Sequence, residues 1–144
     1  MASRNVEQIQ ALHGAFNDRD WDTIREMFAE DCVFVDGRGQ RHEGPDGFAD
    51  DYSKGWADAF SDGQVSKPRY HDAGDTVVAE FVGRGTNDGP LGPLPATDRS
   101  VELPYVEIYQ FDADGKVVAG RAYFDQLDML TQLGHAEAPA EMAG

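Results

Sequence analysis

The first 60 residues place apolar side chains at helical spacing, in groups separated by polar breaks. The first group predicts an amphipathic helix from the positions Val6, Ile9, Leu12 and Phe16. Polar residues 17–20 end that pattern, and Asp20 can cap a second helix. This second helix carries the apolar residues Trp21, Ile24, Met27 and Phe28. Two helices therefore open the chain.

A β-rich run and a third helical pattern follow. The run from Cys32 to Asp36 predicts a strand, closed by the turn-forming residues 37–39. Pro45 suits the first turn of a helix. One face of that helix is aromatic and must pack against another part of the protein: Phe48, Tyr52, Trp56 and Ala59 or Phe60.

The second half of the chain changes from helical to strand-like patterns. Four β-rich runs predict strands at Val65–His71, Thr76–Arg84, Val101–Phe111 and Val117–Tyr123. Asp112 to Gly115 forms a hairpin turn, so the last two strands should pair antiparallel. Residues 85–98 are rich in Gly and Pro, which predicts a long loop at a rim or lid.

Helices first and strands later indicate an α+β domain. Asp125 can cap a last, short helix from Gln126 to Leu133, which Gly134 ends. We expect one domain over residues 1–134 and a mobile tail over residues 135–144.

The charge balance excludes some partners. With 27 acidic and 12 basic residues the formal net charge is −15, which would repel nucleic acid. The chain begins MASRNVEQ, and no apolar run approaches the roughly 20 residues of a membrane span. We therefore expect a soluble, cytoplasmic protein with no nucleic-acid or membrane partner.

Motifs for several chemistries are missing from the sequence. The single cysteine, Cys32, lies between apolar residues and favours a core position. The four histidines lack ligand spacing, so we expect no metal and read each as a surface or hydrogen-bonded residue. Phosphate loops and the Gly-x-Ser-x-Gly motif are absent, which argues against nucleotide binding and serine hydrolysis.

Two carboxylates are the candidates for chemistry. Glu107 lies on the apolar face of a predicted strand among aromatic residues, so it is either a proton-handling acid or a buried Glu satisfied by Arg121 or a tyrosine hydroxyl. Asp36 ends the first strand, where it is either a general base or the acceptor of an Asx turn. Tyr52 and Trp56 belong either to the core or to a pocket wall.

The element order and two segments resemble the SnoaL-like polyketide cyclase family. The segments are AFNDRDWDTIREMFAEDCVFVD (15–36) and DGKVVAGRAYFDQLDMLTQLG (114–134), and the likeness covers nearly the whole chain. This resemblance implies the cone-shaped α+β fold shared with ketosteroid isomerase, limonene epoxide hydrolase and nuclear transport factor. In that fold a curved antiparallel sheet and three N-terminal helices enclose an apolar pocket, and exposed sheet faces commonly pair into a homodimer.

The resemblance transfers some site residues and not others. Asp36 falls where ketosteroid isomerase has its general base, and Glu107 falls near the isomerase's protonated Asp and the cyclases' pocket His. The isomerase's oxyanion tyrosine maps onto Leu12, and the cyclases' catalytic Asp maps onto Ala122. Limonene epoxide hydrolase shares that Asp, and its other catalytic positions map onto Phe81 and Gly83, which argues against epoxide hydrolysis.

Our first hypothesis is a cofactor-free cyclase or isomerase acting on a hydrophobic, polyketide-like carbonyl compound. Asp36 would remove a proton from carbon, and protonated Glu107 would stabilise the enolate oxygen. The expected ligand contacts come from Tyr52, Trp56, Tyr105, Arg121 and Tyr123. A second hypothesis, favoured by Ala122, is a non-catalytic binding or assembly module, and a water-adding or hydroxylating relative is a third.

Overall fold

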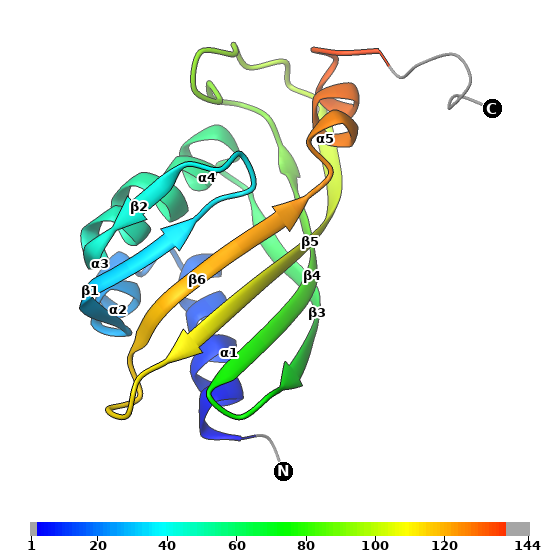
Figure 1. The fold of residues 1–144 in the computed structure, drawn as a ribbon. Coiled ribbons are helices and arrows are strands. Elements are labelled where there is room, and N and C mark those ends of the chain that lie inside the picture. Colours follow the sequence, from blue (N-terminus) through cyan, green and yellow to red (C-terminus); the bar gives the residue numbers. More distant parts are fainter. Residues whose placement is uncertain (1–2, 138–144) are drawn as a thin grey trace.

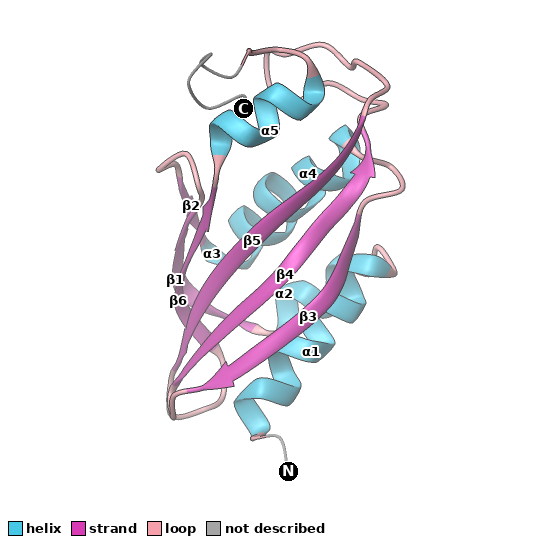
Figure 2. Ribbon diagram, turned by 90° about the vertical axis from the view of Figure 1, so that its right-hand side faces the viewer, coloured by secondary structure: helices cyan, strands magenta, loops and turns pink. Residues whose placement is uncertain are grey.

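Six strands form one curved sheet, and helices cover its concave face (Figures 1 and 2). The structure is a computed structural model that describes residues 3–137. The strand order is β2-β1-β6-β5-β4-β3. The strands are β1 (Phe28–Val35), β2 (Arg41–Glu43), β3 (Gln64–Asp72), β4 (Thr76–Thr86), β5 (Ser100–Phe111) and β6 (Val117–Phe124). The expected α+β class with a curved sheet is confirmed.

The first two helices begin where their capping residues predict. Helix α1 (Arg4–Asn17) starts after Ser3, whose side chain accepts from the Val6 amide. Helix α2 (Trp21–Glu26) starts after Asp20, whose carboxylate accepts from the Thr23 amide. The helix ends earlier than its pattern predicted, because Phe28 already belongs to β1.

The third helical segment changes its winding along its length. It consists of α3 (Gly44–Asp46), a π-helical stretch η1 (Gly47–Ser53) and α4 (Lys54–Ala59). The wider π turn keeps Phe48, Tyr52 and Phe60 buried on the side that faces the sheet. The expected aromatic face is therefore confirmed. π-Helical turns inside α-helices are frequent at functional sites.

The last helix and the strand pairing also follow from local signals. Helix α5 (Gln126–Leu133) lies across one end of the sheet, with Asp125 capping it and Gly134 ending it in the left-handed conformation (Figure 2). Strands β5 and β6 pair antiparallel, as their hairpin turn predicts. Strands β1 and β6 pair parallel, which was not expected, and the charged triplet of β2 gave no strand signal.

The register of β5 positions the interior of the fold. Alternate β5 residues from Val101 to Phe111 are buried on the concave face, and Glu107 is one of them. Its neighbours on the adjoining strands are Ala79 and Ala122. Because both are small, the Glu107 side chain has room between them to reach partners on the helices.

The helices and the C-terminal tail bear on two further expectations. Within residues 3–137, no helix combines the length and the apolar character that crossing a membrane would require. Residues 138–144 of the expected tail lie outside the described residues.

Candidate active site

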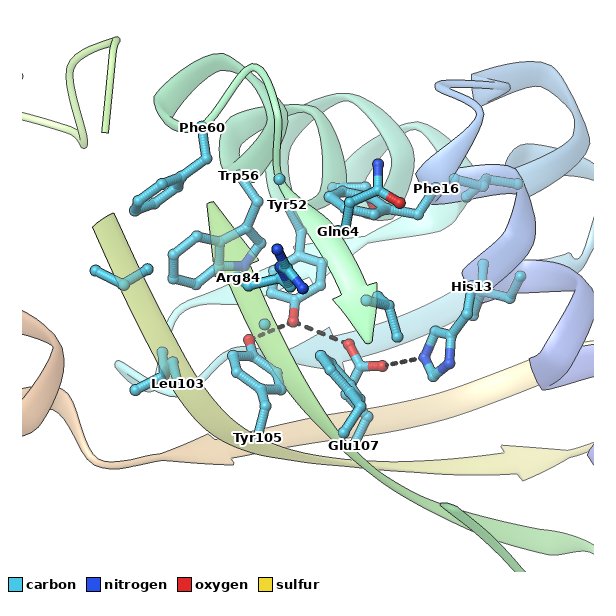
Figure 3. Close-up of a pocket in the computed structure, with 18 of the residues that line it drawn as sticks. His13, Phe16, Tyr52, Trp56, Phe60, Gln64, Arg84, Leu103, Tyr105 and Glu107 are labelled. Atoms are coloured by element: carbon cyan, nitrogen blue, oxygen red, sulfur yellow. Dashed lines mark hydrogen bonds and ion pairs between the residues drawn. The ribbon is translucent and has the colours of Figure 1, made fainter. Parts of the chain in front are cut away.

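Glu107 is buried, and both of its carboxylate oxygens have partners on the helices. Its side chain is 6 % exposed. Oε1 lies 2.9 Å from Nε2 of His13 on α1, and Oε2 accepts a 3.1 Å hydrogen bond from the Tyr52 hydroxyl (Figure 3). One of the two partner types expected for Glu107, a tyrosine hydroxyl, is present, and an imidazole takes the place of Arg121.

His13 connects Glu107 to a tyrosine on the edge strand. Nδ1 of His13 lies 2.8 Å from the hydroxyl of Tyr70 on β3. Burial and then the charge of Glu107 raise the pKa of Tyr70 to about 12, so this hydroxyl stays protonated and donates to Nδ1. In the tautomer that accepts this hydrogen bond at Nδ1, Nε2–H donates to Glu107, so the three side chains form one hydrogen-bonded chain.

Two more tyrosines continue the network on the other side of Glu107. The hydroxyls of Tyr52 and Tyr105 lie 2.5 Å apart. Burial, followed by neighbouring negative charge that includes Glu107, raises the pKa of both tyrosines, so each remains a proton donor. The Tyr109 hydroxyl is also buried, and within residues 3–137 it has no hydrogen-bond partner.

These groups line an inner cavity of about 90 Å³. Glu107, His13 and the hydroxyls of Tyr52, Tyr105 and Tyr109 are surrounded there by apolar side chains. Figure 3 shows Trp56 and Phe60 along one wall, and Arg84 and Gln64 above the network in this view. The inner cavity is therefore small and apolar, with its polar groups concentrated around one carboxylate.

A second, outer cavity of about 400 Å³ contains the other candidate carboxylate. Asp36 and His42 lie in its wall, and the long loop after β4 lines it through residues 91–94. Four other polar side chains also line it: Arg38, Gln40, Asp51 and Gln126. The loop thus forms a rim, as its composition predicted. Apolar side chains complete the wall: Trp56, Leu91, Leu94, Phe124, Met129 and Leu130. Both cavities are lined by three of the same residues, Tyr52, Trp56 and Met129.

Asp36 is an Asx-turn acceptor and a partner of a histidine at once. Its Oδ1 accepts from the amides of Arg38 and Gln40 at 2.9 and 3.0 Å, and its Oδ2 lies 2.9 Å from Nε2 of His42. Burial opposes ionisation, but the hydrogen bonds from His42 and the two amides outweigh it, so the pKa of Asp36 is lowered. Asp36 is thus an ionised and weakly basic carboxylate.

The structure brings together some of the expected ligand residues and separates others. Tyr52, Trp56 and Tyr105 line the inner cavity. Arg121 and Tyr123 do not line either cavity, and Tyr123 is 55 % exposed. The expectation of ligand contacts from these two residues is corrected, because Ala122 pairs with Glu107 on the concave face and its neighbours must point outward.

Sequence reasoning missed both histidines of the site. A signal for His13 existed, since it lies four residues after Ile9 and three before Phe16 and so shares the apolar face of α1. His42 follows no periodic pattern, because it belongs to a three-residue strand of charged residues. The side chains of Asp36 and His42 meet only because the chain reverses direction between β1 and β2.

Comparisons with known proteins identify the family. The model of the SnoaL-like polyketide cyclases matches residues 7–133. The chain belongs to the SnoaL-like polyketide cyclase family. No match is found among curated proteins.

Solved structures of similar proteins cover almost the whole chain. IdmH from Streptomyces antibioticus, a candidate polyketide cyclase, is 26 % identical with a TM-score of 0.77, over 92 % of this chain and 99 % of that one. A SnoaL-like candidate cyclase from Jannaschia sp. CCS1 is 25 % identical with a TM-score of 0.83, over 96 % and 99 %. AclR from Streptomyces galilaeus, a candidate hydroxylase, shares the fold at 22 % identity, with a TM-score of 0.79 over 95 % and 85 %.

Proposed function

We propose that this SnoaL-like protein is a cyclase or isomerase that moves a proton within a hydrophobic, polyketide-like carbonyl compound, without a cofactor. The observation that carries the proposal is the Glu107–His13 pair with its tyrosine hydroxyls, set in an otherwise apolar cavity. Structural packing alone does not require a buried carboxylate, an imidazole and four tyrosines in one region, whereas proton transfer uses such groups.

The reaction divides between two parts of the site. On the Asp36 side, the Asp36–His42 pair takes a proton from the carbon next to the carbonyl group, and the electron pair of the broken C–H bond moves onto the carbonyl oxygen. On the Glu107 side, that oxygen accepts a hydrogen bond from the Tyr105 hydroxyl, which turns from Tyr52 toward the ligand while Tyr52 keeps its hydrogen bond to Glu107. Returning the proton to another carbon completes an isomerisation, and attack of the enolate on a second carbonyl closes a ring.

The two cavities fit an elongated ligand. The inner cavity alone accommodates only a small group, and the outer cavity has the size of a small-molecule site. Tyr52 and Trp56 line both, so a ligand lying along them would place one end beside Asp36 and the other beside the tyrosine pair. This arrangement supports a mostly apolar ligand with few polar groups.

The proposal is tested by solvent deuterium incorporation into a panel of apolar β-keto esters and polycyclic ketones. We expect the wild type to exchange at least one compound, and Glu107→Gln and Asp36→Asn to slow that exchange by about 10²-fold or more. Glu80→Gln is the matched control, because Glu80 also pairs with a histidine, His71, but both side chains are nearly half exposed and line neither cavity. A wild type that exchanges none of the panel, or an unaffected Glu107→Gln variant, would contradict the proposal.

A non-catalytic binding module is the second candidate function. Ala122, where known cyclases carry their catalytic Asp, and the separation of Asp36 and Glu107 into two cavities favour it. Binding of an apolar ketone that is equally tight in the wild type and in Asp36→Asn, with no exchange in either, would support this function.

We also propose the oligomeric state, the location and the partner class of the protein. We propose a homodimer because exposed sheet faces commonly pair in this fold, and a cytoplasmic location as the sequence led us to expect. A small hydrophobic molecule remains the expected partner, and the charge of −15 disfavours nucleic acid.

A further inference from the structure

The carboxylate of Asp36 is fully engaged by its own neighbours. Oδ1 accepts two backbone amides of the turn that follows β1, and Oδ2 is directed at Nε2 of His42. The side chains of Asp36 and His42 are only 10 % and 11 % exposed. A carboxylate held in this way orients an imidazole, but it has little freedom to approach a carbon atom of a ligand.

The hydrogen bond to Asp36 decides which nitrogen of His42 carries the proton. An ionised carboxylate accepts only, so Nε2 donates and the neutral imidazole keeps its lone pair on Nδ1. Within residues 3–137, Nδ1 of His42 has no hydrogen-bond partner. In that part of the chain, the side-chain atoms that are both enclosed and unpaired are Tyr109 Oη and Thr131 Oγ1. Nδ1 of His42 is unpaired but is not one of them, so it is not fully enclosed.

His42 also lies where a ligand could give up a proton to it. It lines the outer cavity of about 400 Å³, whose other walls are mostly apolar. Its ring centroid lies 5.6 Å from that of Tyr52, and the Tyr52 hydroxyl leads to Tyr105 and Glu107. A base at His42 and hydrogen-bond donors at the tyrosine pair would therefore act on neighbouring atoms of one ligand.

We infer that His42 is the base that removes the proton from carbon, with Asp36 as the residue that positions it. The ligand is an apolar ketone or β-keto ester with an acidic C–H bond, and this inference rests on the proposed function. The C–H bond breaks, its proton bonds to Nδ1, and its electron pair forms the enolate whose oxygen the tyrosine pair stabilises. The imidazolium then returns the proton to carbon or to the product oxygen, so no other reactant is needed.

The first test measures the tautomer of His42 without any ligand. Long-range ¹H–¹⁵N correlation spectra of the full chain, with the histidines assigned by single His→Gln variants, should show His42 protonated at Nε2 only. In Asp36→Asn the new amide group can still accept the turn amides but donates to Nε2, so the proton should move to Nδ1. A wild-type His42 protonated at Nδ1 would overturn the inference.

The second test uses 1-tetralone, an enolisable bicyclic ketone, and follows exchange of its α-protons in D₂O. We expect His42→Gln and Asp36→Asn each to lose about 10²-fold or more of the wild-type rate. Added imidazole should restore exchange to His42→Gly, because the base can enter the space left by the side chain. His71→Gln is the matched control, since His71 also pairs with a carboxylate but lies outside both cavities.

The outcomes separate this inference from the proposed function. Amide spectra first establish that each variant is folded. If the wild type exchanges 1-tetralone and His42→Gln exchanges it equally fast while Asp36→Asn does not, Asp36 is the base and only the inference fails. If the wild type exchanges neither 1-tetralone nor any other ketone of the panel, the proposed function fails and the role of His42 as a base fails with it.

Discussion

At the scale of single residues, the inner cavity contains a hydroxyl that lacks a partner. Tyr109 is fully buried and lines this cavity, and its Oη makes no hydrogen bond within residues 3–137. An unsatisfied buried hydroxyl costs about 1–3 kcal/mol of stability. A ligand oxygen in the inner cavity would remove that cost, so Tyr109 is a feature that favours occupancy.

Tyr109→Phe should therefore stabilise the free protein by about 1 kcal/mol and weaken the binding of a ketone ligand by about tenfold. Urea unfolding and ligand titration measure the two effects. Tyr70→Phe is the matched control with the opposite sign, because it removes a hydroxyl that donates to His13. Loss of stability in Tyr109→Phe would mean that its hydroxyl has a partner in solution.

At the scale of elements, the loop between β4 and β5 is fixed by one buried side chain. Asn87 is fully buried, and its amide nitrogen donates to the backbone oxygens of Ala59 and Gly89 at 3.1 and 2.9 Å. Its Oδ1 accepts from the Thr97 amide at 2.9 Å. These bonds join both ends of the loop to the end of α4, so the rim of the outer cavity is anchored and not a free flap.

Asn87→Ala should destabilise the protein by about 2–4 kcal/mol, since it removes three side-chain hydrogen bonds to the backbone, including those of the Gly89 carbonyl and the Thr97 amide. Hydrogen exchange should accelerate over residues 88–98. Asn5→Ala is the matched control, because Asn5 makes one exposed hydrogen bond to Gly74 and its loss should change stability by no more than about 0.5 kcal/mol. Unchanged exchange in the loop of Asn87→Ala would show that other contacts hold the rim.

Elements with strong local signals could be predicted from the sequence. Residues close together in the chain predict the helices through their caps and the long strands through their β-rich runs. They also predict the β5–β6 hairpin through its turn. The short strand β2 and the parallel pairing of β1 with β6 depend on how distant segments meet. The side on which a residue lies depends on register in the same way, which is why Glu107 was placed correctly and Arg121 was not.

At the scale of the whole molecule, the many carboxylates make stability depend on pH. Hydrogen bonds lower the pKa of several of them below the ordinary value: Asp20, Glu80 and Asp88, and Asp36 despite its burial. A carboxylate whose pKa is lower in the folded state contributes stability above its unfolded pKa of about 4. That contribution is lost as the pH falls through the folded value.

The free energy of unfolding should accordingly fall steeply below about pH 4, although protonation also relieves the repulsion within a chain of net charge −15. Urea midpoints between pH 3 and pH 7 measure this change. Asp36→Asn removes one of the contributing groups, so its stability should fall less between pH 5 and pH 3 than that of the wild type. Parallel curves for the two proteins would contradict the lowered pKa of Asp36.

The two acid–base pairs differ in how far apart their members lie along the chain. Asp36 and His42 are six residues apart, within one turn and the short strand that follows it. His13 and Glu107 are 94 residues apart, and Tyr52 and Glu107 are 55 apart. During folding, the first pair needs only a local hairpin, whereas the second needs nearly all of the long-range contacts of the sheet and helices. We therefore expect the buried pair to form after the local one, once the sheet and the helices have come together.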